Sequence, residues 1–411
     1  MVRLFFKLQA IKTVLSFRHC WETMSLTGLS SMPRRSVSTL IKGLKKLLHV
    51  AARPAKSERV HGGRLIHTYR GYGTHREVFL MGRVFRQPGF NLDLPKGSWR
   101  RDLVDIVRRT VRWGVKHIDV QIQLGGQTVT VTTDRDGYFN AHIQLETPLP
   151  GDRIWHEAHL RILSPSRDHK SSRANNGASG EAVADIYIPP ADIDFAVISD
   201  IDDTVMYTGV ANKLKMMYHL FIARAEQRTA FPGVAALYRG FHVGDGDQHC
   251  QRPLLYVSRA PWSIYEMLEA FFRLNHIPVG PILFLREWGL TLQHPLPRKA
   301  EDHKRALIET MLELYDPLTF VLIGDSGQRD PEIYADIVRD YPGRIRTVYI
   351  RDVSNDADRQ QAIEALSAQI DKEQNSECAL VLASDSLTMA EHAHAHGYIS
   401  SDALERVRES Q

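Results

Sequence analysis

Cysteine is scarce in this sequence, and long apolar runs are missing from it. The 411 residues contain three cysteines and no CxxC pair, which argues against a disulfide framework and against a cysteine zinc site. No run of about 18 apolar residues occurs, so we expect no transmembrane helix. The net charge of only +4 argues against a nucleic-acid-binding protein. What is present is an ordinary globular composition, long enough for two or three domains.

Positive charge is concentrated at the N-terminal end of the chain. Residues 1–60 contain twelve Lys or Arg against two Glu, a net charge of +10, so the rest of the chain carries −6. Within this basic arm, one helical face would be apolar, formed by Leu40, Ile41, Leu44, Leu47 and Leu48. A short basic amphipathic helix of this kind either packs against its own protein or lies on an anionic membrane surface.

The location of the protein in the cell is open to two interpretations. Few cysteines are compatible with a reducing compartment, and we expect a cytoplasmic protein with peripheral contact to an anionic membrane through residues 1–60. The same segment is rich in Arg and Ser and poor in acidic residues, so an organellar transit peptide is the alternative. We describe residues 1–64 as a basic arm that is amphipathic or disordered in part.

Residues 65–190 have the strand and turn pattern of an all-β domain. Residues 118–122 and 128–132 alternate between apolar and polar side chains, and the glycine pair between them predicts a β-hairpin. Short strands at this spacing predict a small β-sandwich. Asp134 and Asp136 could bind Ca²⁺, but Asp beside Gly is also what a tight turn requires, and we favour the turn.

Residues 191–411 alternate short apolar runs with amphipathic helical segments. The runs are residues 195–198, 254–257, 282–285, 320–323 and 347–350. Such runs fit strands that are buried on both faces of a parallel sheet. We therefore expect an α/β domain with a doubly wound parallel sheet, a C-terminal helix and a site at the carboxyl ends of the strands.

Acidic side chains follow the first of these strands, in Asp200-Ile201-Asp202-Asp203-Thr204. Side chains two residues apart in an extended segment share a face, so Asp200, Asp202 and Thr204 are predicted to face one crevice. Two carboxylates there require a cation or complementary chemistry. One can act as a nucleophile and the other as a general acid and base. A turn that caps a helix is the alternative interpretation.

Two further polar residues occur at the expected positions between the acidic clusters. Ser258 directly follows the second strand and could hold a phosphate oxygen, although a serine there can also cap a helix. Lys304 lies in a helical segment and could neutralise phosphate charge, although a helical lysine is usually solvated. We assign both to the site because of the acidic clusters on either side.

A second acidic cluster follows the fourth strand, in the segment from Gly324 to Glu332. Asp325 stands at the strand end, where a hard cation with oxygen ligands would be held. Asp330 either supports the ligands or caps the helix that begins with Pro331. We expect a hard cation here, bound by the four aspartates Asp200, Asp202, Asp325 and Asp330.

The order acidic cluster, serine, lysine, acidic cluster is the arrangement of haloacid-dehalogenase-type phosphatases. Finer motifs resemble the catalytic domain of the actin-patch phosphatidate phosphatase family, namely Ser199-Asp200-Ile201-Asp202-Asp203-Thr204, Tyr256-Val257-Ser258, Arg286-Glu287-Trp288-Gly289, His303-Lys304, Gly324-Asp325-Ser326-Gly327-Gln328 and Tyr349-Ile350-Arg351-Asp352. Residues 69–74 and 134–139 resemble the β domain that precedes it in such proteins. The resemblance covers roughly residues 65–400 and leaves out the basic arm.

The resemblance implies a role for each site residue. Asp200 would be the nucleophile, Asp202 the acid and base, Ser258 and Lys304 the groups that hold the phosphoryl group, and Asp325 a Mg²⁺ ligand. An aspartyl-phosphate would form on the nucleophile and then be hydrolysed by an activated water. Few residues separate the first two motifs, which favours an open site that suits a phosphate on a membrane or macromolecule.

Three functions remain open from the sequence. The favoured one is a lipid phosphomonoesterase that converts phosphatidate to diacylglycerol. The second has the same chemistry but acts on a phosphoprotein or a soluble phosphate ester. The third is a non-catalytic, receiver-like binding module. A receiver needs no second acid two residues beyond the first, so Asp202 and Thr204 favour an enzyme, and the family resemblance alone favours the lipid.

Overall fold

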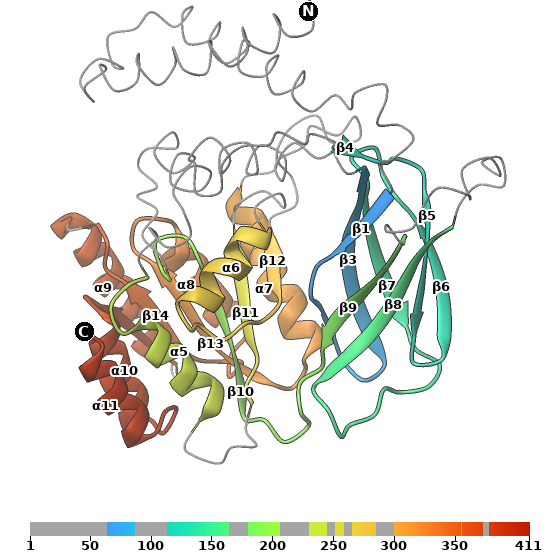
Figure 1. The fold of residues 1–411 in the computed structure, drawn as a ribbon. Helices are drawn as coiled ribbons and strands as arrows, with labels where there is room; N and C mark the ends of the chain where they lie inside the picture. The colour runs from blue at the N-terminus through green and yellow to red at the C-terminus, as the bar shows by residue number, and fades with distance from the viewer. Residues whose placement is uncertain are drawn as a thin grey trace, which may run out of the picture. The chain divides into compact units, whose positions relative to one another are not determined.

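The structure is a computed structural model that describes residues 64–86, 113–163, 180–205, 230–244, 251–258, 265–284, 300–354, 356–372 and 378–411 (Figure 1). The basic arm and the Arg286-Glu287-Trp288-Gly289 motif lie outside the described residues. No described helix is long and apolar enough to cross a membrane.

The first part of the chain forms a nine-stranded sheet. Its strands are β1 Arg64–Thr68, β2 Gly71–Gly73, β3 Glu77–Arg86, β4 Trp113–Gly114, β5 Asp119–Leu124, β6 Gln127–Thr132, β7 Tyr138–Gln144, β8 Trp155–Leu163 and β9 Glu181–Tyr187. They are ordered β1-β3-β2-β9-β8-β5-β6, with β4 and β7 also paired to β3. Alternate residues along β3, β5, β7 and β8 point into one apolar core, which is the period of two that a half-buried strand requires.

The expected hairpin is confirmed. Strands β5 and β6 pair antiparallel with Ile122 opposite Val129. Gly125 and Gly126 both have positive φ, 58° and 81°, the conformation that a two-residue type I′ hairpin turn requires of both its central residues. The turn at Asp134 is also as expected, because its carboxylate accepts hydrogen bonds from the backbone N–H groups of Asp136 and Tyr138.

The second part of the chain forms a six-stranded parallel sheet. Its strands are β10 Phe195–Asp200, β11 Leu254–Ser258, β12 Ile282–Phe284, β13 Thr319–Asp325, β14 Ile345–Arg351 and β15 Ala379–Ala383. All five apolar runs predicted from the sequence form strands, the third over its described residues 282–284, and all pair parallel. Because each strand is apolar on both sides, the sheet requires cover on both faces.

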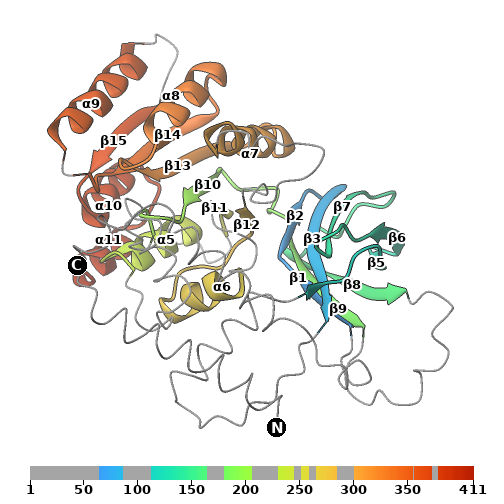
Figure 2. The ribbon, with the colours of Figure 1, turned by 90° about the horizontal axis from the view of Figure 1, so that it is seen from above.

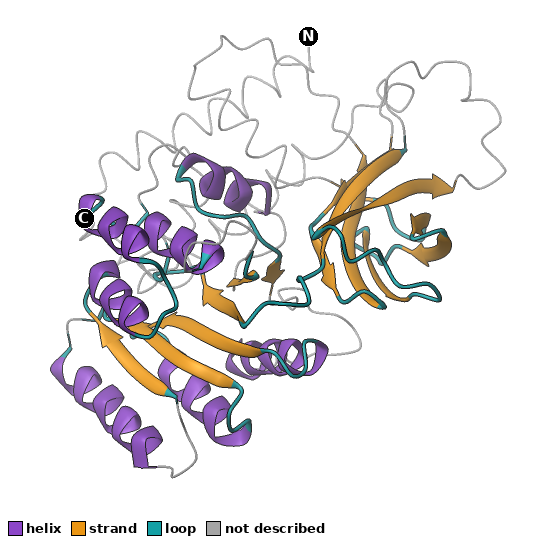
Figure 3. Ribbon diagram, turned by 90° about the horizontal axis from the view of Figure 1, so that it is seen from below, coloured by secondary structure: helices purple, strands orange, loops and turns teal. Residues whose placement is uncertain are grey.

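Helices supply that cover. They are α5 Val234–Val243, α6 Tyr265–Leu274, α7 Ala300–Leu314, α8 Asp330–Asp340, α9 Ala357–Lys372, α10 Ser386–Ala395 and α11 Ser401–Glu409. One apolar core joins the sheet to α5, α6, α10 and α11, and another joins it to α7, α8 and α9. Figure 2 shows these two groups on opposite faces of the sheet, and Figure 3 shows the strands between them.

The strand order places a crevice at the centre of the parallel sheet. The order is β12-β11-β10-β13-β14-β15, so the chain moves outward in one direction after β10 and in the other direction after β13. Ligands of open parallel sheets bind outside the carboxyl ends of the strands at such a reversal. The haloacid-dehalogenase-like assignment of residues 191–411 and the β-sandwich assignment of residues 65–190 stay predictions.

Candidate active site

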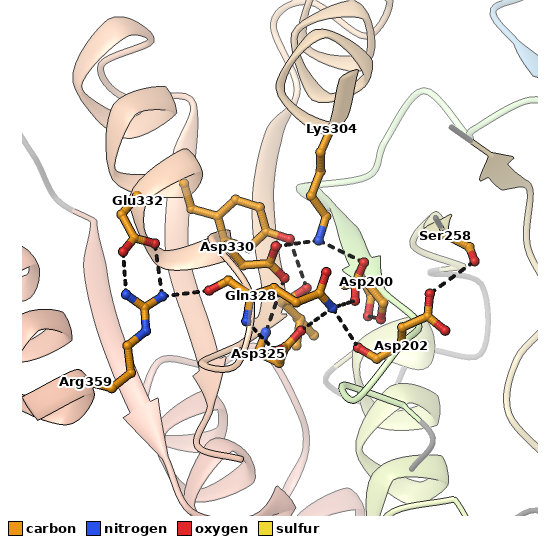
Figure 4. Close-up of polar contacts among 12 residues, drawn as sticks. Asp200, Asp202, Ser258, Lys304, Asp325, Gln328, Asp330, Glu332 and Arg359 are labelled. Carbon is orange, nitrogen blue, oxygen red and sulfur yellow. Dashed lines mark hydrogen bonds and ion pairs between the residues drawn. The ribbon is translucent and has the colours of Figure 1, made fainter. Parts of the chain in front are cut away.

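Two aspartates end the two central strands. Asp200 is the last residue of β10 and Asp325 the last residue of β13, and these strands are hydrogen-bonded neighbours. Both residues are fully buried. The apolar sequences that lead into each aspartate therefore bring two carboxylates together at the sheet edge, and Figure 4 shows the side-chain amide of Gln328 in contact with both.

Lys304 reaches this edge from α7. Its Nζ lies 2.8 Å from Asp200 Oδ1 and 2.5 Å from Asp330 Oδ1, and the lysine is completely buried. Burial alone would lower the pKa of the Lys304 ammonium, but the two carboxylates outweigh burial and raise its pKa above the usual value. Lys304 is therefore a buried cation held between two anions, and the solvated alternative is wrong.

The pKa values of the Asp200 and Asp325 carboxyl groups are raised. Burial raises the pKa of Asp200 well above its ordinary range, and Lys304 offsets only part of this because Asp330, Asp202 and Asp325 also raise it. Burial, followed by the charge of Asp330, raises the pKa of Asp325 to about 7. One buried lysine does not balance so many carboxylates, so a hard cation would complete the charge balance.

Asp330 supports this cluster and does not cap its helix. The residue before α8 is Arg329, and no side chain caps that helix end. Asp330 instead accepts hydrogen bonds from Lys304 Nζ and from the backbone N–H of Asp325. Gly324 makes room for it, because a Cβ at position 324 would lie 2.5 Å from Asp330 Oδ2. The capping interpretation of Asp330 is wrong.

A metal ion could be held by Asp200, Asp325 and Asp330, whose carboxylate oxygens lie within 4.8 Å of one another. Carboxylate oxygens are the ligands that Mg²⁺ prefers, so the residues fit the expected ion. The Asp202 carboxylate, which we also predicted as a ligand, is not in this group. The backbone oxygen of Asp202 lies beside the group, because Gln328 Nε2 donates to that oxygen and to the carboxylates of Asp200 and Asp325.

The Asp202 carboxylate belongs instead to the neighbouring strand end. Ser258 Oγ donates a long hydrogen bond, 3.5 Å, to Asp202 Oδ2. Asp203, between Asp202 and Thr204, has a positive φ of 56°, a strained backbone conformation that is common at functional sites. Thr204 is buried, and its hydroxyl oxygen has no hydrogen-bond partner among the described residues.

Three residues of the site were not singled out from the sequence. Gln328 donates from Nε2 to Asp325 and Asp200. Arg351, at the end of β14, donates to the backbone oxygen of Thr204. Arg359, on α9, binds the backbone oxygens of Ser326 and Gln328. Gln328 and Arg351 lie within the motifs that carry the family resemblance, but their roles depend on contacts that sequence spacing does not reveal.

Comparison with known proteins gives one family match. Residues 195–352 match the family model described as phosphatidate phosphatase APP1, catalytic domain. The phosphatidate phosphatase APP1 of Saccharomyces cerevisiae is 28% identical over 234 residues, which cover 57% of this chain and 36% of that protein. An uncharacterized protein of Schizosaccharomyces pombe is 30% identical over 161 residues, which cover 39% of this chain and 26% of that protein. The chain thus spans about a third or less of the length of these relatives.

The similarity of this chain to solved structures is weak. A ferredoxin-NADP⁺ reductase from Plasmodium falciparum aligns over 70% of this chain and 96% of that chain, with 11% identity and a TM-score of 0.19.

The family match covers the strands β10, β11, β12, β13 and β14, and with them every site residue described above except Arg359.

Proposed function

On the premise that residues 195–352 belong to the phosphatidate phosphatase APP1 catalytic-domain family, we propose that this chain is a Mg²⁺-dependent phosphomonoesterase that converts phosphatidate to diacylglycerol. The observation that carries the proposal is the buried group formed by Asp200, Asp325 and Lys304 at the carboxyl ends of β10 and β13. The fold that we propose for this domain is haloacid-dehalogenase-like.

The first chemical step uses Asp200 and Asp202. A carboxylate oxygen of Asp200 attacks phosphorus, and the bond from phosphorus to the glycerol oxygen breaks as an aspartyl-phosphate forms. The Asp202 carboxyl group gives its proton to the departing oxygen, which leaves as an alcohol. The contact between Ser258 Oγ and Asp202 Oδ2 supports this role, because it orients the carboxyl group toward the second strand end.

The second step returns the enzyme to its starting form. The Asp202 carboxylate takes a proton from water, the water oxygen attacks phosphorus, and the bond from phosphorus to Asp200 breaks. Inorganic phosphate leaves and Asp202 is protonated again. A Mg²⁺ ion held by Asp200 and Asp325, with Asp330 beside them, would compensate the negative charge of the phosphate and the carboxylates.

Lys304 and Ser258 hold the phosphoryl group in this proposal. An ammonium has three donors, and two of those of Lys304 are directed at Asp200 and Asp330, which leaves the third for a phosphoryl oxygen. Ser258 lies on the other side of Asp200, at the end of β11, so the two groups would hold the phosphoryl group from both sides.

Location and membrane contact belong to the same proposal. We place the protein in the cytoplasm, with residues 1–60 attracted to the anionic membrane in which phosphatidate resides.

A panel of substrates tests the function. Phosphate release from dioleoyl-phosphatidate in vesicles, lysophosphatidate, phosphopeptides and sugar phosphates should be fastest for dioleoyl-phosphatidate and should require Mg²⁺. Faster release from a phosphopeptide or a sugar phosphate would show that this compound, and not phosphatidate, is the preferred substrate. No release from any of them would contradict the proposal that the chain is a phosphatase.

A further inference from the structure

The side-chain amide of Gln328 lies where three oxygens meet, two of them from carboxylates of the candidate cation site and one from the backbone of Asp202. Its Nε2 is 2.8 Å from Asp325 Oδ2, 3.3 Å from Asp200 Oδ2 and 3.4 Å from the backbone oxygen of Asp202 (Figure 4). An amide nitrogen has only two hydrogens to donate, so three acceptors compete for two donors. Several converging oxygens are also what a hard cation takes as ligands.

The opposite end of the same amide is poorly accommodated. Gln328 Oε1 is buried and accepts no hydrogen bond from the described residues. Turning the amide over would direct Oε1 at three other oxygens, so the nitrogen must be the end that faces them. A buried acceptor without a partner is unfavourable, and withdrawal of the side chain from this position would remove that penalty.

The backbone beneath Gln328 is held independently of its side chain. Arg359 donates to the backbone oxygens of Ser326, at 2.8 Å, and of Gln328, at 2.6 Å. The same guanidinium forms a two-pronged ion pair with Glu332. The backbone N–H of Gln328 donates to Asp325 Oδ1 at 3.0 Å. The amide can therefore leave the three oxygens by rotation about side-chain bonds, without a shift of the loop.

We propose that Gln328 competes with the cation for these three oxygens. Its amide donates to them when no cation is bound and withdraws when Mg²⁺ binds. The inference rests on the magnesium site of the proposed function and adds to it a side chain that opposes binding. Without a cation, the amide lessens repulsion between Asp200 and Asp325, so it stabilises the cation-free protein and weakens Mg²⁺ binding by the same interaction.

Calorimetric titration of the full chain with Mg²⁺, after removal of metals with EDTA, tests the proposal. In Gln328→Ala the amide is absent, and in Gln328→Asn it is one methylene short of the oxygens. Both variants should bind Mg²⁺ about tenfold more tightly than the parent protein, the effect of losing a hydrogen bond to a charged group. The cation-free variants should melt at a lower temperature, and Mg²⁺ should raise their Tm more than that of the parent. Gln123→Ala, at an exposed position of β5, is the matched control and should behave as the parent does.

Each other outcome contradicts the proposal. Unchanged Mg²⁺ affinity in both variants would make Gln328 a purely structural residue, and weaker affinity would make it a ligand. If Gln328→Ala does not fold, Gln328→Asn decides. Failure of the proposed function is recognised separately: if neither the parent nor the variants bind Mg²⁺, the metal site itself is rejected and this inference with it. If the parent binds and the variants bind no better, the metal site stands and only this inference fails.

Discussion

Asp200 and Lys304 form an ion pair of 2.8 Å in which both side chains are completely shielded from solvent. Removing one member of such a buried pair leaves the other charge uncompensated. Lys304 also compensates Asp330, so its loss would leave two carboxylates without their cation.

Lys304→Met should therefore destabilise the protein by about 3–5 kcal/mol in the presence of a chelator. Urea unfolding followed by circular dichroism measures this. Lys372→Met, at an exposed position near the end of α9, is the control and should change stability by less than about 0.5 kcal/mol. Equal stability of the Lys304 variant and the parent would show that the pair is not formed in solution.

Asp200→Asn should abolish phosphatase activity without unfolding the protein, since the amide keeps the shape but is not a nucleophile. Asp202→Asn should reduce turnover by about 10²- to 10⁴-fold, the usual contribution of a general acid and base. Phosphate release and melting temperature would be measured together. Substantial turnover by a folded Asp200→Asn protein would remove Asp200 from the nucleophile's role.

Stability in the absence of a cation should depend on the ionisation of Asp325. Its pKa is raised from its ordinary value near 4 to about 7, so between these values the folded protein binds more protons than the unfolded chain. Stability from this group is thus fully present below about pH 4 and is lost as the pH rises through about 7. Thermal unfolding in EDTA between pH 5 and pH 8 should show this decline.

Asp325→Asn should flatten that decline, and the exposed variant Asp185→Asn should not. In excess Mg²⁺ the decline should shrink in the parent, because a bound cation favours the ionised carboxylate. An identical pH dependence in the parent and Asp325→Asn would mean that other groups cause the decline.

Gly324→Ala should displace Asp330. The added Cβ would approach Asp330 Oδ2 to 2.5 Å, so the carboxylate must move away from Lys304, at a cost of about 1–3 kcal/mol. Mg²⁺-dependent activity should fall with it. Gly151→Ala is the control, because the nearest atom to its new Cβ is 3.8 Å away. Equal unfolding free energies for Gly324→Ala and Gly151→Ala would contradict the prediction that a side chain at position 324 displaces Asp330.

The basic arm should bring the protein to anionic membranes. Each Lys or Arg near an anionic leaflet contributes about 1 kcal/mol, and the effect is screened by salt. In co-sedimentation with phosphatidate-containing vesicles, the full chain should pellet more than a chain that starts at Val60, and less at high salt. Equal pelleting of the two chains would assign membrane contact to another part of the protein.

Local sequence patterns predicted the strands and the main site residues for a clear reason. Asp200, Ser258 and Asp325 each end an apolar run, and a parallel sheet brings such ends to one edge. Gln328 was not predicted, because a glutamine in a turn is ordinarily solvated and its contact with Asp200 spans 128 residues of sequence. The backbone oxygen of Asp202 was missed for a related reason, since only the positive φ at Asp203 and the fold around it show where that oxygen points.

The reversal of strand order between β10 and β13 has a consequence for biosynthesis. Asp200 is made before Asp325, yet the two stand on adjacent strands, and Lys304 and Asp330 are also made after Asp200. Contacts between such distant residues form only after the intervening chain has been made. A nascent chain, or a product truncated before residue 319, would contain Asp200, Ser258 and Lys304 but would lack Asp325 and Asp330, two of the three residues of the candidate metal site. If the proposed mechanism holds, we therefore expect no phosphatase activity until translation has passed Asp330.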